Sequence, residues 1–159
     1  MYNIFIDYLL REGLLGEAVT ITPINNLNNI KIIEENSNLF SVDFTPDNID
    51  YYNFMVKNLG GMHTSDFGKR NKDGTIDYSI RLNNKNAFNV LSIVMSLLRH
   101  YLNSYNVKTI YVRTTVDRRD VYNLIFDRSF KDYTYTSNEY DEVDEDGIKY
   151  CGIFLKKIR

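Results

Sequence analysis

The segment from residue 75 to residue 136 most constrains the fold of this chain, because strand and helix patterns follow one another there without a break. Apolar residues alternate with polar ones where a strand is expected and recur three and four positions apart where a helix is expected. Strands joined through helices of this length predict right-handed crossovers and some parallel pairing. The expected class is α/β (α+β), with a mixed central sheet covered by helices. The predicted elements are a strand over 75–82, a helix from 86 to about 105, a strand over 108–113, a helix from Asp117 and a strand over 132–136.

The residues before this segment predict a strand, a helix and a loop. Alternation over 40–44 is typical of a half-buried strand. Thr45 and Pro46 are a favourable cap and first residue of a helix, so the sequence predicts a helix over 46–59 that ends at two glycines. The polar residues after these glycines, up to residue 74, predict a loop.

Length and composition narrow the classes of function. A chain of 159 residues has the size of one domain, so we expect a single domain over 1–159. The formal net charge of −2 argues against binding to nucleic acid or to anionic membranes, which requires an excess of basic residues. No apolar run is long enough to span a bilayer, and the amphipathic stretch 2–15 lacks the features of a signal peptide. Thirteen tyrosines favour a protein-binding surface, since tyrosine gives a large contact area with a polar tip.

His63 is a candidate catalytic residue because it lies in the loop expected after the second predicted helix. It could form an acid–base pair with Asp66 or activate Ser65 as a nucleophile. The alternative is a solvated histidine without a chemical role. The chain has one cysteine, Cys151, which excludes an internal disulfide and fits a reducing compartment. With so few histidines and cysteines at unsuitable spacing, no metal site is predicted.

Arg113, Arg118 and Arg119 flank the end of one predicted strand and the first turn of the next helix. Ligands of open α/β sheets bind at such an edge, and the N-terminus of a helix attracts anions. The three arginines are therefore candidate ligands for a phosphate or a carboxylate. The alternative is that they form ion pairs with nearby acids such as Asp117 and Asp120.

An acidic segment separates the last two predicted strands, which are expected to form an antiparallel hairpin ending in a strand over 148–156. Alternating acids followed by Gly147 resemble the first half of a calcium loop, but the twelfth position is Ile153 where that loop requires glutamate. The segment is better explained as a solvated hairpin tip that could dock a basic partner. Its acids are Glu139, Asp141, Glu142, Asp144, Glu145 and Asp146.

The order of elements after residue 75 resembles the second half of the Gcn5-related N-acetyltransferase fold, a β-α-β-α-β-β arrangement. In that family, a Gln/Arg-x-x-Gly-x-Gly/Ala loop before the long helix holds the pyrophosphate of acetyl-CoA. The equivalent residues here, 81–88, contain no glycine, so the resemblance implies the scaffold without this loop, and no cofactor is expected. A divergent acyltransferase would use Tyr122, which matches the family's later tyrosine, as general acid and a carboxylate such as Asp77 as base.

A second set of residues resembles a group of small bacteriophage proteins. Their pattern is an aromatic-x-Val before a long helix, an Ile-x-Phe/Val strand, and Arg-x-x-x-Tyr at the head of the next helix. The matching residues are Phe88, Val90, Ile93 and Val94, then Ile110 and Val112, then Arg118 and Tyr122.

This second resemblance implies a non-enzymatic, virion-associated structural or assembly protein, with the head-to-tail region as one position in the particle. Its partners would be other virion proteins or further copies of itself, with no nucleic acid and no membrane. Its location would be the host cytoplasm and then the virion. Two alternatives stay open: the divergent acyltransferase, and an inhibitor of a host factor that binds a small ligand through its arginines.

Overall fold

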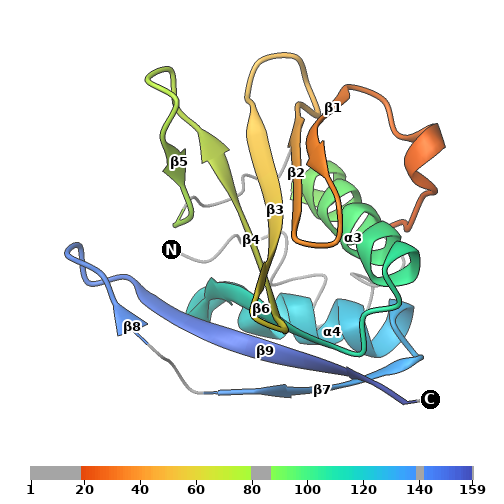
Figure 1. Ribbon diagram of the computed structural model, residues 1–159. Helices are drawn as coiled ribbons and strands as arrows, with labels where there is room; N and C mark the ends of the chain where they lie inside the picture. Colours follow the sequence, from red (N-terminus) through yellow and green to blue (C-terminus); the bar gives the residue numbers. More distant parts are fainter. Residues whose placement is uncertain (1–18, 80–86, 139–141, 159) are drawn as a thin grey trace.

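The computed structural model describes residues 19–79, 87–138 and 142–158. In these residues one twisted sheet carries two helices, α3 (Ala87–Ser104) and α4 (Arg119–Ser129), and both lie behind the sheet in Figure 1. Two short 3-10 turns, η1 (Ile24–Asn26) and η2 (Val116–Arg118), complete the described elements. The strands are β1 (Ile30–Glu35), β2 (Leu39–Phe44), β3 (Tyr52–Leu59), β4 (Met62–Arg70), β5 (Ile76–Asp77), β6 (Thr109–Thr115), β7 (Tyr133–Ser137), β8 (Glu142–Val143) and β9 (Lys149–Lys157).

The sheet is mixed, as the sequence predicts. Its order is β1-β2-β3-β4-β6-β9-β7, with β5 added to β4 and β8 added to β9. All pairs are antiparallel except β4 with β6, which are parallel and are connected through β5 and α3. The parallel pairing runs only from His63 opposite Ile110 to Ser65 opposite Val112, although both strands continue. Beyond these residues lies a separation that we call the split.

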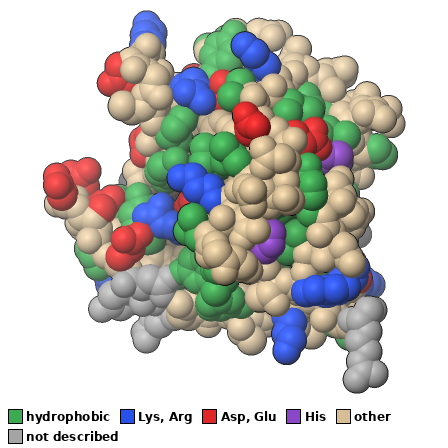
Figure 2. All heavy atoms as spheres, in the orientation of Figure 1, with side chains coloured by type: hydrophobic (Ala, Val, Ile, Leu, Met, Phe, Trp, Pro, Cys, Tyr) green, Lys and Arg blue, Asp and Glu red, His purple; other side chains and the backbone are tan. Residues whose placement is uncertain are grey.

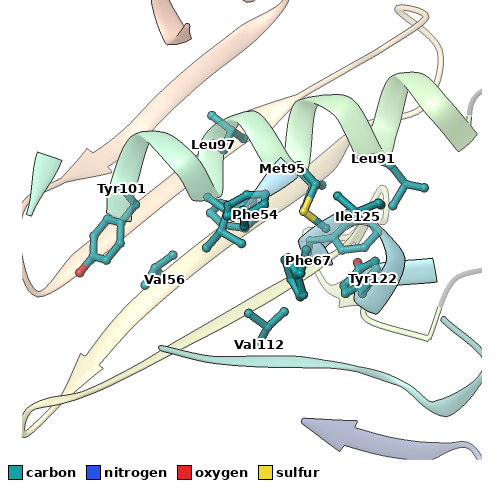
Figure 3. Close-up of a cluster of buried hydrophobic side chains, with 14 of the residues drawn as sticks. Phe54, Val56, Phe67, Leu91, Met95, Leu97, Tyr101, Val112, Tyr122 and Ile125 are labelled. Atoms are coloured by element: carbon teal, nitrogen blue, oxygen red, sulfur yellow. The ribbon is translucent and has the colours of Figure 1, made fainter. Parts of the chain in front are cut away.

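Helix α3 supplies much of the hydrophobic core, and its predicted extent is confirmed to within two residues. One of its faces packs on β3 and β4, where Phe54 and Phe67 point toward it (Figure 3). The same periodicity that predicts the helix selects this face. Arg99, on the neighbouring face, donates to both carboxylate oxygens of Asp132 at 2.8 Å and so ties α3 to the start of β7. The buried residues of α3 are Ala87, Val90, Leu91, Val94, Met95, Ser96, Leu97, Leu98, Tyr101 and Leu102.

The helix predicted over 46–59 is wrong, because most of this segment forms β3. Tyr52, Phe54 and Val56 are buried toward α3, and this alternation by two is the period of a strand. The glycines expected to end a helix, Gly60 and Gly61, instead have φ values of 65° and 98°. Two positive φ values are what the tightest hairpin turns require, and the turn joins β3 to β4. Pairing with strands on both sides thus outweighs the local helix signal at residues 45 and 46.

The loop predicted over 62–74 and the strand predicted over 75–82 are also revised. Residues 62–70 form β4, the strand at the centre of the sheet. The later strand is confined to Ile76 and Asp77 among the described residues, and they fold back on β4 opposite Arg70 and Lys69. Thr75, Tyr78 and Ser79 lie outside this strand, so the prediction is too long. Residues 80–82 of the predicted strand, and the amphipathic stretch 2–15, fall outside the described residues.

The C-terminal half follows the prediction closely. Strands β6 and β7 and helix α4 occupy the predicted positions, with η2 inserted before α4. Strand β9 pairs antiparallel with β6 on one side and with β7 and β8 on the other. Neither described helix is long and apolar enough to cross a membrane.

Gly68 should be essential for holding β5 against β4. A Cβ atom at this position would lie 2.5 Å from the backbone oxygen of Asp77 and 2.7 Å from the Ile76 side chain. Backbone cannot swing aside as the end of a side chain can, so we expect Gly68→Ala to lower the free energy of unfolding by about 1–3 kcal/mol. Urea denaturation measures this. The matched control is Gly152→Ala, where the obstructing atoms belong to the outer part of the Tyr111 ring, which can rotate toward solvent. An equal or larger loss at Gly152 would contradict this account.

Candidate functional site at the split between β4 and β6

Asp66 and Arg113 are the first residues after the parallel pairing ends, and their side chains meet across the split. The Arg113 guanidinium lies 3.4 Å from the Asp66 carboxylate. Its Nε donates to Glu142 of β8 at 3.0 Å, and its NH2 group donates to the same oxygen. The guanidinium carbon also lies 4.1 Å from the centroid of the Tyr150 ring. One arginine thus connects β4, β6, β8 and β9, and we call these contacts the Arg113 clamp.

In the Arg113 clamp, burial and ion pairing act on each pKa in opposite directions. Burial raises the pKa of Asp66, while the charge and hydrogen bond of Arg113 act in the opposite direction. Burial would lower the pKa of Arg113, but Glu142 and Asp66 outweigh it and the pKa is raised. Arg113 therefore stays charged, and its charge is matched by two carboxylates of the same chain.

Arg118 fastens the start of α4 to the turn after β5. Its Nε donates to the Thr115 hydroxyl at 2.9 Å, and its NH2 group donates to the carbonyl of Tyr78 at 2.5 Å. The guanidinium carbon lies 5.0 Å from the centroid of the Phe67 ring, within the range of a cation–π contact. Arg118 thus lies beside the split, close to the residues that line it.

Arg119 points toward a different part of the molecule. It donates to the carbonyl of Asn138 at 3.2 Å, after the end of β7, and its Nε lies 3.9 Å from Asp120. The structure therefore brings Arg113 and Arg118 to the split and directs Arg119 away from it. Each of the three arginines already forms hydrogen bonds within the chain. An anion site formed by all three stays a prediction.

Tyr122 lies beneath the split, on the core side. It is buried, and with Ser65, Phe67, Val112 and neighbouring residues it lines a cavity of about 10 Å³, room for about one water molecule (Figure 3). The Tyr122 and Thr114 hydroxyls are both buried, and neither forms a hydrogen bond of ordinary geometry with the described residues. Burial raises the pKa of Tyr122 to about 12, against the opposing effects of Arg118 and Thr114. Tyr122 is therefore protonated at neutral pH and can donate a proton.

The structure does not place Asp77 together with Tyr122. The Asp77 carboxylate accepts hydrogen bonds from the backbone N–H of Ser79 at 2.9 Å and from its hydroxyl at 2.7 Å. These bonds close the turn after β5, so the carboxylate has a local structural role. Among the residues that line the same cavity as Tyr122, the acidic one is Asp66, whose carboxylate lies on the other face of β4, beside Arg113. The sequence did not reveal this because the prediction placed Asp66 in a loop.

His63 belongs to β4 and not to a loop. Its Nδ1 lies 3.1 Å from the hydroxyl of Tyr101, which donates to the carbonyl of Ser37 at 3.0 Å. Burial lowers the pKa of His63. Successive residues of a strand point to opposite faces, so His63 and Ser65 share the face toward α3 while Asp66 points to the other face. The proposed pairing of His63 with Asp66 is therefore not found, and the hydrogen bonds of His63 link β4 to α3.

The acidic segment is partly used for structure. Glu142 belongs to the Arg113 clamp, and the Asp144 carboxylate accepts the backbone N–H groups of Asp146 and Ile148 at 2.9 Å each. The Tyr150 hydroxyl donates to Asp144 at 3.3 Å. Glu145 and Asp146 are exposed, whereas Glu139 and Asp141 lie outside the described residues. Within the described ranges, no group of three or more His, Cys, Asp or Glu side chains could hold a metal ion.

Replacing Arg113 should expose the cost of burying Asp66. In Arg113→Met, Asp66 keeps its burial and loses its counter-ion, so we expect a loss in the free energy of unfolding of about 1–3 kcal/mol near neutral pH. The folded pKa of Asp66 would rise further above 3.8, its ordinary value. A raised folded pKa penalises the ionised form, so the loss should be largest at alkaline pH and shrink as the pH falls through the folded pKa. Denaturation at several pH values measures it.

The double variant Asp66→Asn/Arg113→Met is the control, because it removes the buried charge together with its partner. It should be more stable than Arg113→Met at alkaline pH and should lose most of the pH dependence. A loss in Arg113→Met that does not change with pH would contradict the assignment to Asp66.

Comparison with known protein families gives no match for this chain. No curated protein sequence matches it either.

Proposed function

We propose that this chain is a non-enzymatic protein that binds other proteins in the assembly of a bacteriophage particle. The observation that supports this most is the Arg113 clamp, which holds the outer side of the split together with side chains of the chain itself. In open α/β sheets, ligands bind in the crevice outside the carboxyl ends of the strands, which is where β4 and β6 separate. Here the clamp spans that separation, and the cavity behind it has the volume of about one water molecule.

The charges exposed on this side of the sheet fit a binding role. Figure 2 shows basic and acidic side chains intermixed on the face turned toward the viewer. Ion pairs also link separate parts of the sheet, such as Arg70 of β4 with Asp43 of β2 at 2.7 Å and Lys69 of β4 with Asp50 at 3.0 Å. Paired charges of both signs give orientation and specificity in protein interfaces, whereas a highly charged substrate is bound better by unpaired charges of one sign.

The setting in a phage particle comes from the resemblance carried by residues such as Phe88, Arg118 and Tyr122. It implies synthesis in the host cytoplasm, followed by incorporation into the virion next to other virion proteins or further copies of the chain. The hydrogen bonds that Arg118 donates to Thr115 and Tyr78 support a structural role for this motif.

Incorporation into particles tests this proposal. Particles of the virus that encodes the chain should contain it at a fixed ratio to the major capsid protein through successive density gradients. Calorimetry of the purified chain with millimolar acetyl-CoA should give no heat of binding. A chain that stays in the soluble fraction and never sediments with particles would overturn the assembly role.

A divergent acyltransferase is the second candidate, and it is favoured by the buried hydroxyl of Tyr122, which forms no hydrogen bond of ordinary geometry with the described residues. Burying a hydroxyl without a hydrogen bond costs free energy, so such groups often serve a function or bind water. Tyr122 is protonated at neutral pH and could protonate a leaving thiolate, while Asp66, whose pKa is raised by burial, could accept a proton from an amine. This second reading replaces Asp77 by Asp66 and requires the Arg113 clamp to open.

Tyr122→Phe separates the two candidates. Removing a buried hydroxyl that forms no hydrogen bond of ordinary geometry with the described residues should change the free energy of unfolding by no more than about 1 kcal/mol. The release of CoA thiol from acetyl-CoA, measured with a panel of primary amines, should be absent in both the wild type and the variant if the chain is not an enzyme. Thiol release by the wild type that falls by about 10²-fold or more in the variant would establish the acyltransferase. The matched control is Tyr133→Phe, whose hydroxyl bonds to the carbonyl of Val107 away from the split.

A further inference from the structure

The two edges of the sheet differ in how they are protected against pairing with another strand. At one edge, β1 carries Lys31, Glu34 and Glu35, and its register with β2 shifts between Ile32 and Glu34. Charges and a bulge on an edge strand both discourage the addition of a further strand. This edge has the features of one that is kept unpaired.

The other edge, β7, has none of these protections. Its sequence is Tyr-Thr-Tyr-Thr-Ser, without a charge or a proline, and its register with β9 is continuous from Tyr133 to Ser137. Aromatic and β-branched residues are those that favour strand pairing most. An uncharged, regular edge strand of this composition is a template for another strand.

The hydrogen bonds around β7 show which of its backbone groups point outward. Ile158 donates to Asp132, and Asn138 donates to Gly152, so the even-numbered residues of this segment bond to β9. In an antiparallel strand, the backbone N–H and C=O groups of successive residues point alternately to the two sides of the strand. Those of Tyr135 and Ser137 therefore point away from β9, as does the carbonyl of Tyr133. The N–H of Tyr133 is used by the carbonyl of Phe130. Within the part of the chain that the structure describes, no hydrogen bond to the outward groups of Tyr135 and Ser137 or to the Tyr133 carbonyl is found, so they form a ladder for a further strand.

We propose that β7 pairs antiparallel with β7 of a second copy of this chain, about a twofold axis at Tyr135. In this register, Tyr135 exchanges both backbone hydrogen bonds with Tyr135 of the second copy. The N–H of Ser137 donates to the carbonyl of Tyr133 in the second copy. The N–H of Tyr133 is not needed for this pairing and keeps its bond to Phe130. The sheets of both copies then form one continuous sheet.

The side chains of β7 are self-complementary in this register. On the face away from α4, Thr134 and Thr136 are exposed, and each lies opposite the other residue in the second copy. Cross-strand pairs of threonine are favourable, and no like charges meet because the strand carries no charge. A second copy therefore fits this edge without a change in sequence.

The face of β7 toward α4 offers room for the second copy. A groove of about 410 Å³ lies between the end of α4 and β7. It is lined by both apolar and polar groups, which suits the ring and the hydroxyl of a tyrosine such as Tyr135 of the second copy. The residues that line it are Phe126, Asp127, Lys131, Tyr133, Thr134 and Tyr135.

This pairing does not depend on the proposed function, because it rests on β7 and not on the split. Its test is a charge-exchange experiment with two double variants, Thr134→Lys/Thr136→Lys and Thr134→Glu/Thr136→Glu. The substituted side chains are exposed in one copy, so each variant should fold with a circular dichroism spectrum like that of the wild type. In the dimer, each variant places like charges directly opposite one another.

Sedimentation equilibrium should show a dimer for the wild type and a monomer for each double variant at the same concentration. An equimolar mixture of the lysine and glutamate variants should restore the dimer, because opposite charges then face each other across the axis. Misfolding could not produce this recovery. The matched control is Ile32→Lys/Ile33→Lys on β1, which adds the same charge at exposed positions of the other edge and should remain dimeric.

Three results would overturn the proposal: a monomeric wild type throughout the accessible concentration range, a mixture that stays monomeric, or a dimer that only the β1 variant dissociates. Because none of these measurements involves phage particles or acetyl-CoA, failure of the pairing can be distinguished from failure of the proposed function.

Discussion

The short parallel pairing of β4 with β6 is the constraint on which the rest of the structure depends. It joins the antiparallel strands β1 to β4 to the C-terminal strands, and α3 packs along the junction on one face. Parallel neighbours require a long crossover connection, and α3 provides it. Because the pairing ends at Ser65 and Val112 while both strands continue, the same junction creates the split and brings Asp66, Arg113 and Tyr122 to it.

Energetically, the Arg113 clamp substitutes for the missing backbone pairing. Where β4 and β6 no longer pair with each other, side chains take over the contact between them, with one guanidinium between two carboxylates and an aromatic ring. Partly buried ion pairs add little net stability, since desolvation offsets most of the attraction, but breaking one by removing a single partner is costly. The clamp therefore acts mainly to specify how the two halves of the sheet meet.

Elements whose apolar residues repeat with a clear helical or strand period could be predicted from the sequence. Elements that depend on pairing with other strands could not. Helix α3 has an apolar stripe long enough to identify it without tertiary information, and the strands around Val112 and Ile153 follow from their apolar alternation. Strand β3 was misassigned because Thr45 and Pro46 give a local helix signal, and because Tyr52, Met55, Val56 and Leu59 also match a helical spacing. Phe54 fits the strand pattern alone. Only the strands on both sides of β3 decide between the two patterns.

The candidate site shows the same division. The positions of Arg113 and Arg118, at the end of a strand and before a helix, could be inferred from local pattern. Their partners could not, since Asp66 and Glu142 lie 47 and 29 residues from Arg113 and come from strands that the prediction missed or left as a turn. Without the partners, three arginines suggest an anion site. With them, two become links within the fold, and the buried hydroxyl of Tyr122 becomes the group that most needs an explanation.

Helix α4 connects this hydroxyl with the exposed edge of the sheet. Tyr122 lies on the side of the helix that lines the cavity behind the split, whereas Phe126 and Asp127 line the groove beside β7. Asn123, between them, donates to the Ser137 hydroxyl at 3.4 Å. A strand added at β7 would lie beside this groove, and any displacement of α4 would change the space around Tyr122, because close-packed interiors transmit strain. The groove beside the edge strand and the buried hydroxyl of Tyr122 thus share one helix.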